Sequence, residues 1–367
     1  MFRSRLSALF LAAAAGVATP AVAADAPTAA ELKAVTDKGY DFLKGKQKDD
    51  GSFGDKRANP GVTALTAAAL IRSGKSADDP VVAKALKYIE SRSKKDGGFH
   101  EDALQNYMTC CAIMAFKEAN ADGKYDKVIQ AAAEFVRGMQ VGGKEEDAGY
   151  GGAGYGGKGR PDLSNTHFFV EALIASGAKP DDPAIKKALA FVSRSQNLPS
   201  EEYNKLPFAA KATEADKGGF VYSATDDPSD PKKNPKATAD GGLRSEGGMT
   251  YAGLKSFLYA GVGKDDPRVK AALAWVKKHY TVDENPGMGK SGLYYYYHVF
   301  SKAMDALGEP LFEDAKGVKH PWKKELFEKL KKEQQSDGSW VNGADKFMEG
   351  MPELTTSFAL LSLSYCK

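Results

Sequence analysis

The chain has few cysteines for its 367 residues, only Cys110, Cys111 and Cys366. Adjacent cysteines such as Cys110 and Cys111 can be joined only through a strained bridge. A scaffold held together by disulfides carries more cysteines, usually in an even number. We therefore expect three free, buried thiols and a fold that is stabilised by an apolar core.

The chain also lacks a strong charge of one sign. Its formal net charge is +3, and acidic and basic residues are mixed along it, without a dense basic stripe. Proteins that bind nucleic acid concentrate positive charge on one face or in one segment. We therefore expect no nucleic-acid partner.

Long apolar runs are absent beyond the N-terminus. There, Arg3 and Arg5 precede an apolar stretch over 6–18 and the small residues Ala21, Val22 and Ala23. This order is typical of a secretory signal peptide, and its apolar stretch is too short to span a bilayer. We predict a signal peptide over 1–23 and an exported chain over 24–367, periplasmic or secreted, without a membrane span.

What the sequence does contain is an internal repeat. Helical patterns end in turns that combine glycine with an aromatic residue, and three stretches repeat the order glycine, aspartate, aspartate, proline. The glycine ends one helix, the second aspartate caps the next helix, and the proline takes its first position. The turn aromatics are Phe53, Phe99, Tyr150, Phe220, Tyr294 and Trp340, and the aspartate–proline pairs are Asp79-Pro80, Asp182-Pro183 and Asp266-Pro267.

The second helix of every repeat starts in one register. It is phased by a hydroxyl residue near its start, and these residues are Thr63, Thr109, Thr166, Thr250, Tyr297 and Thr356. The phased helices are apolar on most faces, which indicates burial. Six pairs of one half-buried and one buried helix predict an all-α (α/α)6 toroid with inner and outer helix rings. An open solenoid is the alternative, but its repeats are shorter and more regular.

Two insertions interrupt the single toroid domain predicted over 24–367. They lie at about 142–160, which is rich in glycine, and 197–247, which is crowded with Asp-Pro and Lys-Pro pairs. Long segments of this kind in a compact domain are usually functional lids or disordered loops. Both precede inner helices, so we expect both to overhang one mouth of the ring.

The turn formed by Gln334, Asp337, Gly338, Ser339 and Trp340 resembles the repeat of the squalene–hopene cyclase and protein prenyltransferase superfamily. The resemblance covers essentially the whole chain after the signal peptide. Members of this superfamily are α/α toroids. The resemblance to its cyclases implies a central apolar cavity that holds a linear isoprenoid, which an acid at the start of an inner helix protonates.

The acidic motif of those cyclases is incomplete in this chain. Asp162 and Thr166 match the Asp-x-Asp-Asp-Thr-Ala-like motif, but Ser164 stands where the proton-donating acid is expected. A serine hydroxyl cannot be tuned to protonate an alkene as a carboxylic acid can. Asp162 and Glu246 are the remaining candidate acids, and catalysis is doubtful.

The zinc site that the resemblance to prenyltransferases implies is not reproduced either. The residues just before the phased positions include no cysteine or histidine. His167, His298 and Cys110 each lie one residue after a phased position and are the alternative set of metal ligands. The glycines between Gly152 and Gly157 have dinucleotide-binding spacing but lack the strand that such a site needs. We expect no metal and no other cofactor.

Aromatic and polar residues at inner-helix starts are the candidate ligand contacts. Aromatic faces stabilise carbocations in the cyclases that the chain resembles. Consecutive tyrosines from Tyr294 onward point around the whole helix, so only part of that run can face a cavity. The expected contacts are Ser164, Asn165, Thr166, His167, Thr250, Tyr251, Tyr294, Tyr297 and His298.

Three charged residues lie within otherwise apolar inner helices. Glu171, Lys255 and Lys302 each follow a phased position by five residues. Charges buried among apolar helices must be paired. We therefore expect the three side chains to form a buried network.

These features favour binding of an apolar, isoprenoid or lipid-like ligand. If the chain is an enzyme, the resemblance implies a terpenoid cyclase-like isomerase or a prenyl-transferring enzyme. The alternative is a non-catalytic scaffold for a protein partner in the cell envelope. A polysaccharide-acting toroid is disfavoured because the chain has only three tryptophans. A continuous apolar cavity would favour the ligand, and a filled core would favour the scaffold.

Overall fold

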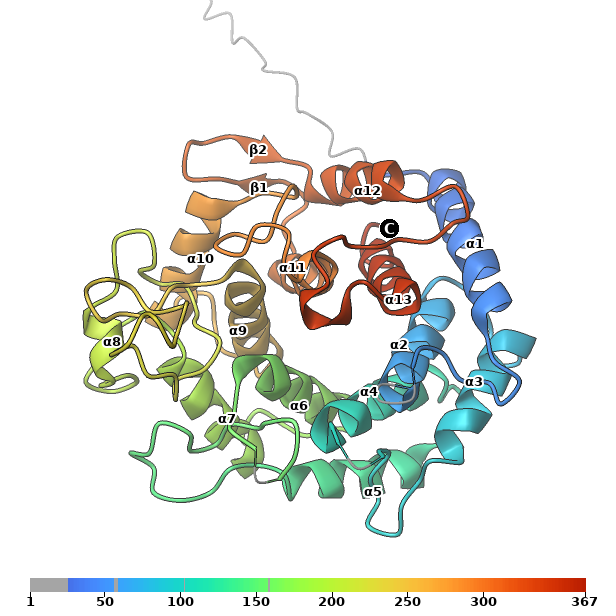
Figure 1. The fold of residues 1–367 in the computed structure, drawn as a ribbon, viewed down its shortest axis with the longest axis horizontal. Coiled ribbons are helices and arrows are strands. Elements are labelled where there is room, and N and C mark those ends of the chain that lie inside the picture. The colour runs from blue at the N-terminus through green and yellow to red at the C-terminus, as the bar shows by residue number, and fades with distance from the viewer. Residues whose placement is uncertain (1–25, 56–58, 102, 158) are drawn as a thin grey trace, which may run out of the picture.

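The computed structural model describes residues 26–55, 59–101, 103–157 and 159–367, so the predicted signal peptide over 1–23 lies outside the described residues. Two concentric rings of helices surround one axis (Figure 1). The inner ring consists of α2 (Asn59–Arg72), α4 (Gln105–Glu118), α6 (Leu163–Ala175), α9 (Gly247–Tyr259), α11 (Leu293–Leu307) and α13 (Pro352–Leu363). The outer ring consists of α1 (Ala29–Lys46), α3 (Pro80–Glu90), α5 (Asp126–Arg137), α7 (Pro183–Arg194), α10 (Pro267–His279) and α12 (Trp322–Glu333).

The inner ring closes between its first and last helices. Each inner helix contacts the next one along the chain, and α13 returns to contact α2. At that closure the hydroxyls of Thr66 and Ser357 lie 2.8 Å apart in a buried hydrogen bond. The predicted (α/α)6 toroid is therefore confirmed, and the open solenoid is wrong.

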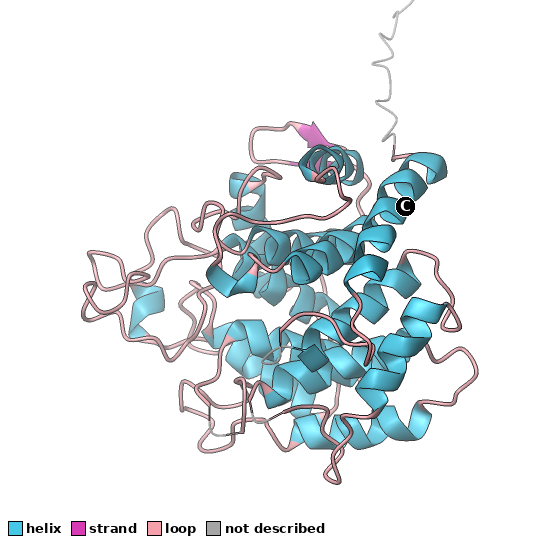
Figure 2. Ribbon diagram, turned by 45° about the vertical axis from the view of Figure 1, so that its right-hand side comes forward, coloured by secondary structure: helices cyan, strands magenta, loops and turns pink. Residues whose placement is uncertain are grey.

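Little other regular structure is present among the described residues. The turned view in Figure 2 shows helices throughout and one short strand pair at the edge. The strands β1 (Phe312–Glu313) and β2 (Lys319–His320) pair antiparallel beside α12. The short helix α8 (Pro207–Ala210) lies in the second predicted insertion, and the 3-10 turn η1 (Lys346–Met348) precedes α13. No helix of the described residues is long and apolar enough to cross a membrane.

The phasing threonines join each turn to its inner helix. In five repeats the threonine hydroxyl accepts a hydrogen bond from the backbone N–H of the preceding turn, at 3.0–3.1 Å. The bond satisfies a buried N–H that would otherwise destabilise the turn. The donor and acceptor residues are Phe53 and Thr63, Phe99 and Thr109, Ala153 and Thr166, Phe220 and Thr250, and Trp340 and Thr356.

Two of the six predicted turn aromatics are wrong. In the third turn the donor is Ala153, because Gly151 (φ 81°) takes the position that Gly51 (φ 92°) has two residues before Phe53. In the fifth repeat Tyr294 lies inside α11, which begins at Leu293. Glycine-aromatic spacing therefore identifies the repeat but not every turn residue.

A glutamine in four repeats ties neighbouring repeats together. Its side-chain N–H groups donate both to the carbonyl of the turn glycine and to a carbonyl of the adjacent outer helix or its start, over 2.8–3.2 Å. Gln334 makes the last of these links, to the carbonyl of Val35 in α1, and so closes the outer ring. At the same turn a Cβ on Gly338 would meet the Lys38 carbonyl oxygen at 2.2 Å, which is why this turn requires glycine.

Local capping follows the sequence prediction. The carboxylates of Asp79, Asp182 and Asp266 accept backbone N–H groups of the helices that start with the next proline. The three cysteines are buried and unbridged, as expected.

Candidate functional site

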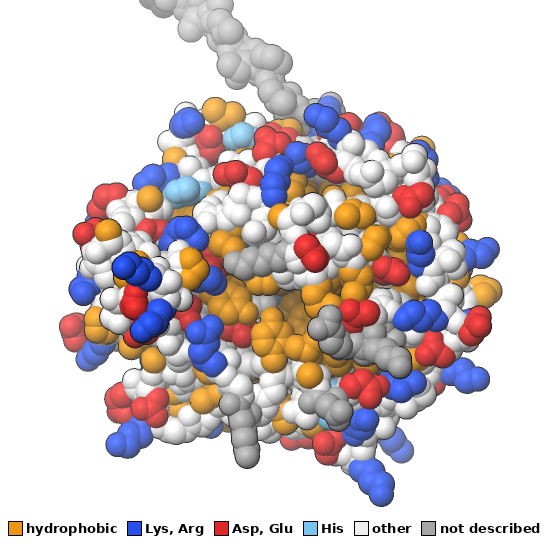
Figure 3. All heavy atoms as spheres, viewed as in Figure 1, with side chains coloured by type: hydrophobic (Ala, Val, Ile, Leu, Met, Phe, Trp, Pro, Cys, Tyr) orange, Lys and Arg blue, Asp and Glu red, His pale blue; other side chains and the backbone are white. Residues whose placement is uncertain are grey.

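An apolar cavity opens among the N-terminal ends of the inner helices. It has a volume of about 200 Å³ and receives side chains from all six of them. Figure 3 shows hydrophobic side chains gathered in a hollow near the centre of the face seen in Figure 1. The inner-helix residues that line it are Val62, Tyr107, Met108, Ser164, Gly248, Met249, Tyr295, Leu354 and Phe358.

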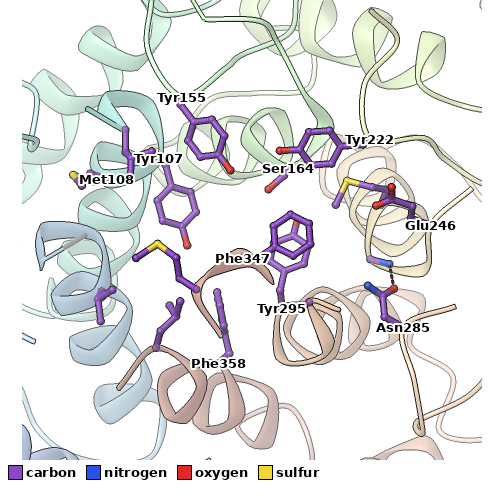
Figure 4. A pocket seen from close by; sticks show the side chains of 17 residues that line it. Tyr107, Met108, Tyr155, Ser164, Tyr222, Glu246, Asn285, Tyr295, Phe347 and Phe358 are labelled. Carbon is purple, nitrogen blue, oxygen red and sulfur yellow. Dashed lines mark hydrogen bonds between the residues drawn. The ribbon is translucent and has the colours of Figure 1, made fainter. Parts of the chain in front are cut away.

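One register position supplies much of this wall. In five of the six inner helices the residue two positions before the phased residue lines the cavity, because these helices start in the same phase. At this position α6 presents Ser164 and α11 presents Tyr295, both labelled in Figure 4. The cavity wall therefore repeats around the ring as the sequence repeats along the chain.

Loops complete the rim of the cavity. Tyr155 comes from the first predicted insertion, and Tyr222 from the second; both side chains point into the space in Figure 4. Phe347 and Met348, from η1, close another side. The side chains of Tyr155 and Phe347 are 40 % and 39 % exposed, so the rim stays in contact with solvent.

Backbone strain is concentrated at this cavity. Leu104, Phe347 and Met348 are the non-glycine residues with positive φ in the described part of the chain, at 56°, 68° and 64°, and all three line the cavity. A left-handed conformation is unfavourable by about 1–2 kcal/mol for a residue with a Cβ. Strain of this kind is found most often at ligand-binding and catalytic sites.

The buried Glu349 holds the strained turn against α11. Its carboxylate accepts the backbone N–H of Tyr295 at 2.8 Å and the side-chain amide of Asn342 at 2.6 Å. Burial raises its pKa, and these hydrogen bonds oppose that shift. Glu349 thereby fixes both the rim and the start of the helix that carries Tyr295.

Glu246 is the carboxylate at the cavity wall. It is 3 % exposed, and Lys236 Nζ lies 2.7 Å from its Oε1, an ion-pair contact whose angles are not those of a hydrogen bond. The same ammonium group lies 3.8 Å from the centre of the Tyr222 ring, as a cation–π contact. Glu246 therefore faces the cavity as the partner of a lysine from the second insertion.

Asp162 lies behind the cavity wall, as the N-cap of α6. Its carboxylate accepts the backbone N–H of Asn165 at 2.8 Å and the Asn165 side-chain amide at 3.0–3.1 Å. Burial raises its pKa to about 6 even though these hydrogen bonds lower it. Ser164, two residues later, reaches the cavity instead.

Aromatic rings and two histidines fill the axis below the cavity. Phe168 packs against His167, with ring centres 4.3 Å apart, and stacks with His298 at 6.2 Å. Phe358, which lines the cavity, lies 5.3 Å from His298. Among the described residues neither ring nitrogen of His298 has a hydrogen-bond partner. Burial lowers the pKa of both histidines well below the usual range, so both are neutral.

The charged layer lies one further turn down the inner helices. Lys255 Nζ lies 2.5 Å from one carboxylate oxygen of Glu171, and Lys302 pairs with the other oxygen. The three side chains are at most 5 % exposed. Burial alone would raise the pKa of Glu171, but the two ammonium groups hold it well below 4.5. The predicted buried network is confirmed.

The remaining predicted contacts lie outside the cavity wall. Thr166 and Thr250 accept the turn N–H groups described above. Tyr251 packs between Tyr296 and Phe300, with ring centres 5.6 and 5.0 Å away. The Tyr297 hydroxyl donates to the Val282 carbonyl at 2.7 Å, and the Tyr294 ring packs on Tyr297.

Of the predicted contacts, the cavity thus brings together Ser164 and Glu246, with His167 and His298 beneath them. Sequence reasoning missed Tyr107, Tyr155, Tyr222 and Tyr295. The two on inner helices share the register of Ser164, so the repeat phase could have identified them. No such signal exists for the rim tyrosines, because their loops have no fixed register.

No group of three or more His, Cys, Asp or Glu side chains in the described part of the chain is placed to hold a metal ion. The alternative set of His167, His298 and Cys110 is therefore not assembled. Cys110 Sγ donates to the side-chain carbonyl of Asn106 at 3.5 Å instead.

Comparison with known proteins agrees with this architecture. Residues 56–211 match the family model of the squalene-hopene cyclase C-terminal domain. No curated protein matches the chain. The predicted resemblance to the squalene–hopene cyclase superfamily is thus confirmed.

Two solved structures with TM-scores of at least 0.50 share the fold. A protein from Actinoplanes is 16 % identical, with a TM-score of 0.53 and 91 % of this chain and 99 % of that chain covered. The type II terpene cyclase MstE from Scytonema is 14 % identical, with a TM-score of 0.50 and 91 % and 98 % covered. A variant of MstE in complex with merosterolic acid A as product is 14 % identical, with a TM-score of 0.48 and 92 % and 97 % covered.

Proposed function

We propose that this chain binds an apolar, isoprenoid or lipid-like ligand in the cavity at the inner-helix starts. The observation that carries the proposal is the cavity itself, a mostly apolar space walled by aromatic rings, with a few polar groups on one side. Small-molecule sites have this composition. Strained residues at its rim support a ligand site rather than a surface formed by packing alone.

The filled lower half of the axis limits the size of that ligand. Phe168, Phe257 and Phe300 are buried and lie below or behind the cavity, whereas Phe358 forms part of its wall. The ligand cavity is therefore confined to the mouth at the inner-helix starts. A long isoprenoid ligand that enters must fold into this upper space or leave part of its length at the rim.

We also propose that binding occurs without cyclisation. Ser164 holds the register position of the expected acid, and the Asp162 carboxylate is occupied by Asn165 behind the wall. Glu246 reaches the cavity, but its carboxylate is paired with the Lys236 ammonium group. Aromatic walls without an available acid support holding an isoprenoid rather than starting a carbocation reaction.

The test is lipid extraction and mass spectrometry of the purified protein. Leu354→Trp, which fills the cavity, should lose the co-purified apolar molecule. Val318→Trp, at a residue that is 49 % exposed in the β1–β2 hairpin, should keep it. No apolar molecule in the unchanged protein, and no uptake of added squalene or farnesol, would overturn the proposal in favour of a scaffold.

The catalytic part is tested separately with squalene and geranylgeraniol. Unreacted probe should be recovered after incubation with the unchanged protein. A cyclised product that disappears in Glu246→Gln or Asp162→Asn would instead identify a cyclase and its acid.

We propose further that the chain is exported after removal of residues 1–23. The order of basic, apolar and small residues at the N-terminus supports this proposal. The mass of the protein recovered from the periplasm or medium should correspond to a start near Ala24. An uncleaved cytoplasmic product would contradict it.

A further inference from the structure

A chain of hydrogen bonds runs from the cavity wall to the buried charged layer. The Tyr295 hydroxyl, at the cavity, lies 2.7 Å from His167 Nε2. On the other side of the ring, His167 Nδ1 lies 2.9 Å from Lys255 Nζ. Lys255 in turn pairs with Glu171. Three inner helices, α6, α9 and α11, thus contribute to one polar connection through an otherwise apolar axis.

The chemistry of the groups sets the direction of this connection. An ammonium group has only donors, so His167 Nδ1 accepts from Lys255. A neutral imidazole has one donor and one acceptor, so the proton is on Nε2 and is donated to the Tyr295 oxygen. Burial keeps His167 neutral and Tyr295 protonated, because it lowers the pKa of the histidine and raises that of the tyrosine. The Tyr295 proton is therefore directed away from His167, toward the cavity side.

The charged layer also contains more positive than negative charge. Glu171 is shared by two ammonium groups, Lys255 and Lys302. Arg72 and Glu118 line a small void together with Lys302, and they form a pair of their own with 3.0 Å between Nη1 and Oε1. The two ammonium groups thus share a single negative charge, which leaves the layer with one positive charge in excess. Beyond Lys255 the donors point toward the cavity, from Lys255 to His167 and from His167 to Tyr295.

We propose that the ligand carries an acceptor oxygen, a carboxylate or carbonyl, at the end that contacts Tyr295. The inference rests on the proposed function and deepens it, since it adds a polar head to the apolar chain. A donor polarised by the connection binds an oxygen with negative charge more tightly than a hydrocarbon. Ser164, beside Tyr295 in the wall, is hydrogen-bonded to the Tyr295 hydroxyl and opposes the rise in the pKa of that tyrosine.

The experiment compares three probes with the same apolar chain: farnesoic acid, its methyl ester and farnesene. Titration calorimetry of the unchanged protein should give the order acid, ester, hydrocarbon from tightest to weakest. Tyr295→Phe removes only the hydroxyl and should weaken acid binding at least about tenfold, with little change for farnesene. Tyr296→Phe is the matched control, because the next tyrosine of α11 lies outside the cavity wall and its hydroxyl donates to the Thr281 carbonyl at 2.7 Å, so acid binding should change less than about threefold.

The possible results separate the two proposals. No binding of any probe overturns the proposed function. Equal binding of acid and hydrocarbon, or an unchanged acid affinity in Tyr295→Phe, overturns the acceptor-oxygen inference and leaves the apolar site intact.

Histidine ring ¹⁵N NMR gives a second readout that does not depend on binding. His167 should be neutral with its proton on Nε2 in the unchanged protein. The Nε2 resonance should move in Tyr295→Phe and stay in Tyr296→Phe. A proton on Nδ1 would reverse the direction of the connection and overturn the inference.

Discussion

The two halves of the toroid axis are built from the same helices but differ in chemistry. Near the helix starts the inner face is apolar and hollow, with Tyr295 and Ser164 among its few polar groups. Seven residues further along α6, the same face carries Glu171, which pairs with Lys255 and Lys302 in a buried layer. One half can accept a molecule, and the other holds the helices together. Along the same inner helices, the candidate ligand site is thus followed by a buried ionic layer.

The largest effect on stability is expected from a substitution that breaks the charged layer. Glu171→Gln leaves two buried ammonium groups without a counter-charge, so the free energy of unfolding should fall by about 3–5 kcal/mol. Urea unfolding followed by circular dichroism measures it. Asp37→Asn removes an acid that pairs with Lys33 and Lys75 on the surface, and it should change stability by less than about 1 kcal/mol.

Adding Lys302→Met to Glu171→Gln sharpens the same comparison. The double variant has one unpaired ammonium group fewer, so it should regain part of the lost stability. If the single variant is as stable as the unchanged protein, the layer is hydrated and the contrast between the two halves does not hold.

The pH dependence of stability should differ in sign between the two halves. The pKa of Glu171 is lowered, so its contribution is present above 4.5 and is lost as pH falls through the lower folded value. The pKa of Asp162 is raised from 3.8 to about 6, so its contribution is present below 3.8 and is lost as pH rises through about 6.

Asp162→Asn removes the pH-dependent contribution of Asp162 to stability and leaves that of Glu171. Two pKa units correspond to about 3 kcal/mol, so the variant should lack a decline of this order between pH 4 and pH 7. Stability measured by urea unfolding at several pH values tests this. An unchanged pH profile would mean that the Asp162 carboxyl is solvated rather than buried behind the cavity wall.

The smallest effect on stability is expected at the rim. Phe347→Gly removes an aromatic side chain that is 39 % exposed but also relieves its positive φ, so stability should change by about 1 kcal/mol or less. Ligand exchange should become faster, because the rim loses a covering ring. Stopped-flow release of bound farnesoic acid measures the rate, and Val341→Gly, at another exposed residue, is the control.

Much of the fold could be predicted because its signals are local. The caps at Asp79, Asp182 and Asp266 and the turn glycines act within a few residues, so the sequence displays them directly. The exceptions were Tyr150 and Tyr294, where the glycine register and the helix start decided instead. The charged layer could also be predicted, because charges on neighbouring apolar helices have no other partners.

The candidate site was harder to predict for a physical reason. Which of four consecutive tyrosines faces the cavity depends on the rotation of α11, whose first turn is hydrogen-bonded to Glu349, more than fifty residues further along the chain. The rim tyrosines Tyr155 and Tyr222 come from insertions without a helical register.

The sequence by itself determined the six-helix-pair ring, the helix caps and the replacement of the expected acid by Ser164, since periodicity and residue identity suffice for these. Only the tertiary structure decided that Tyr295 meets His167, 128 residues away, and that His167 meets Lys255. Such contacts form when the ring closes, because closure brings the same register position of separate helices onto one axis.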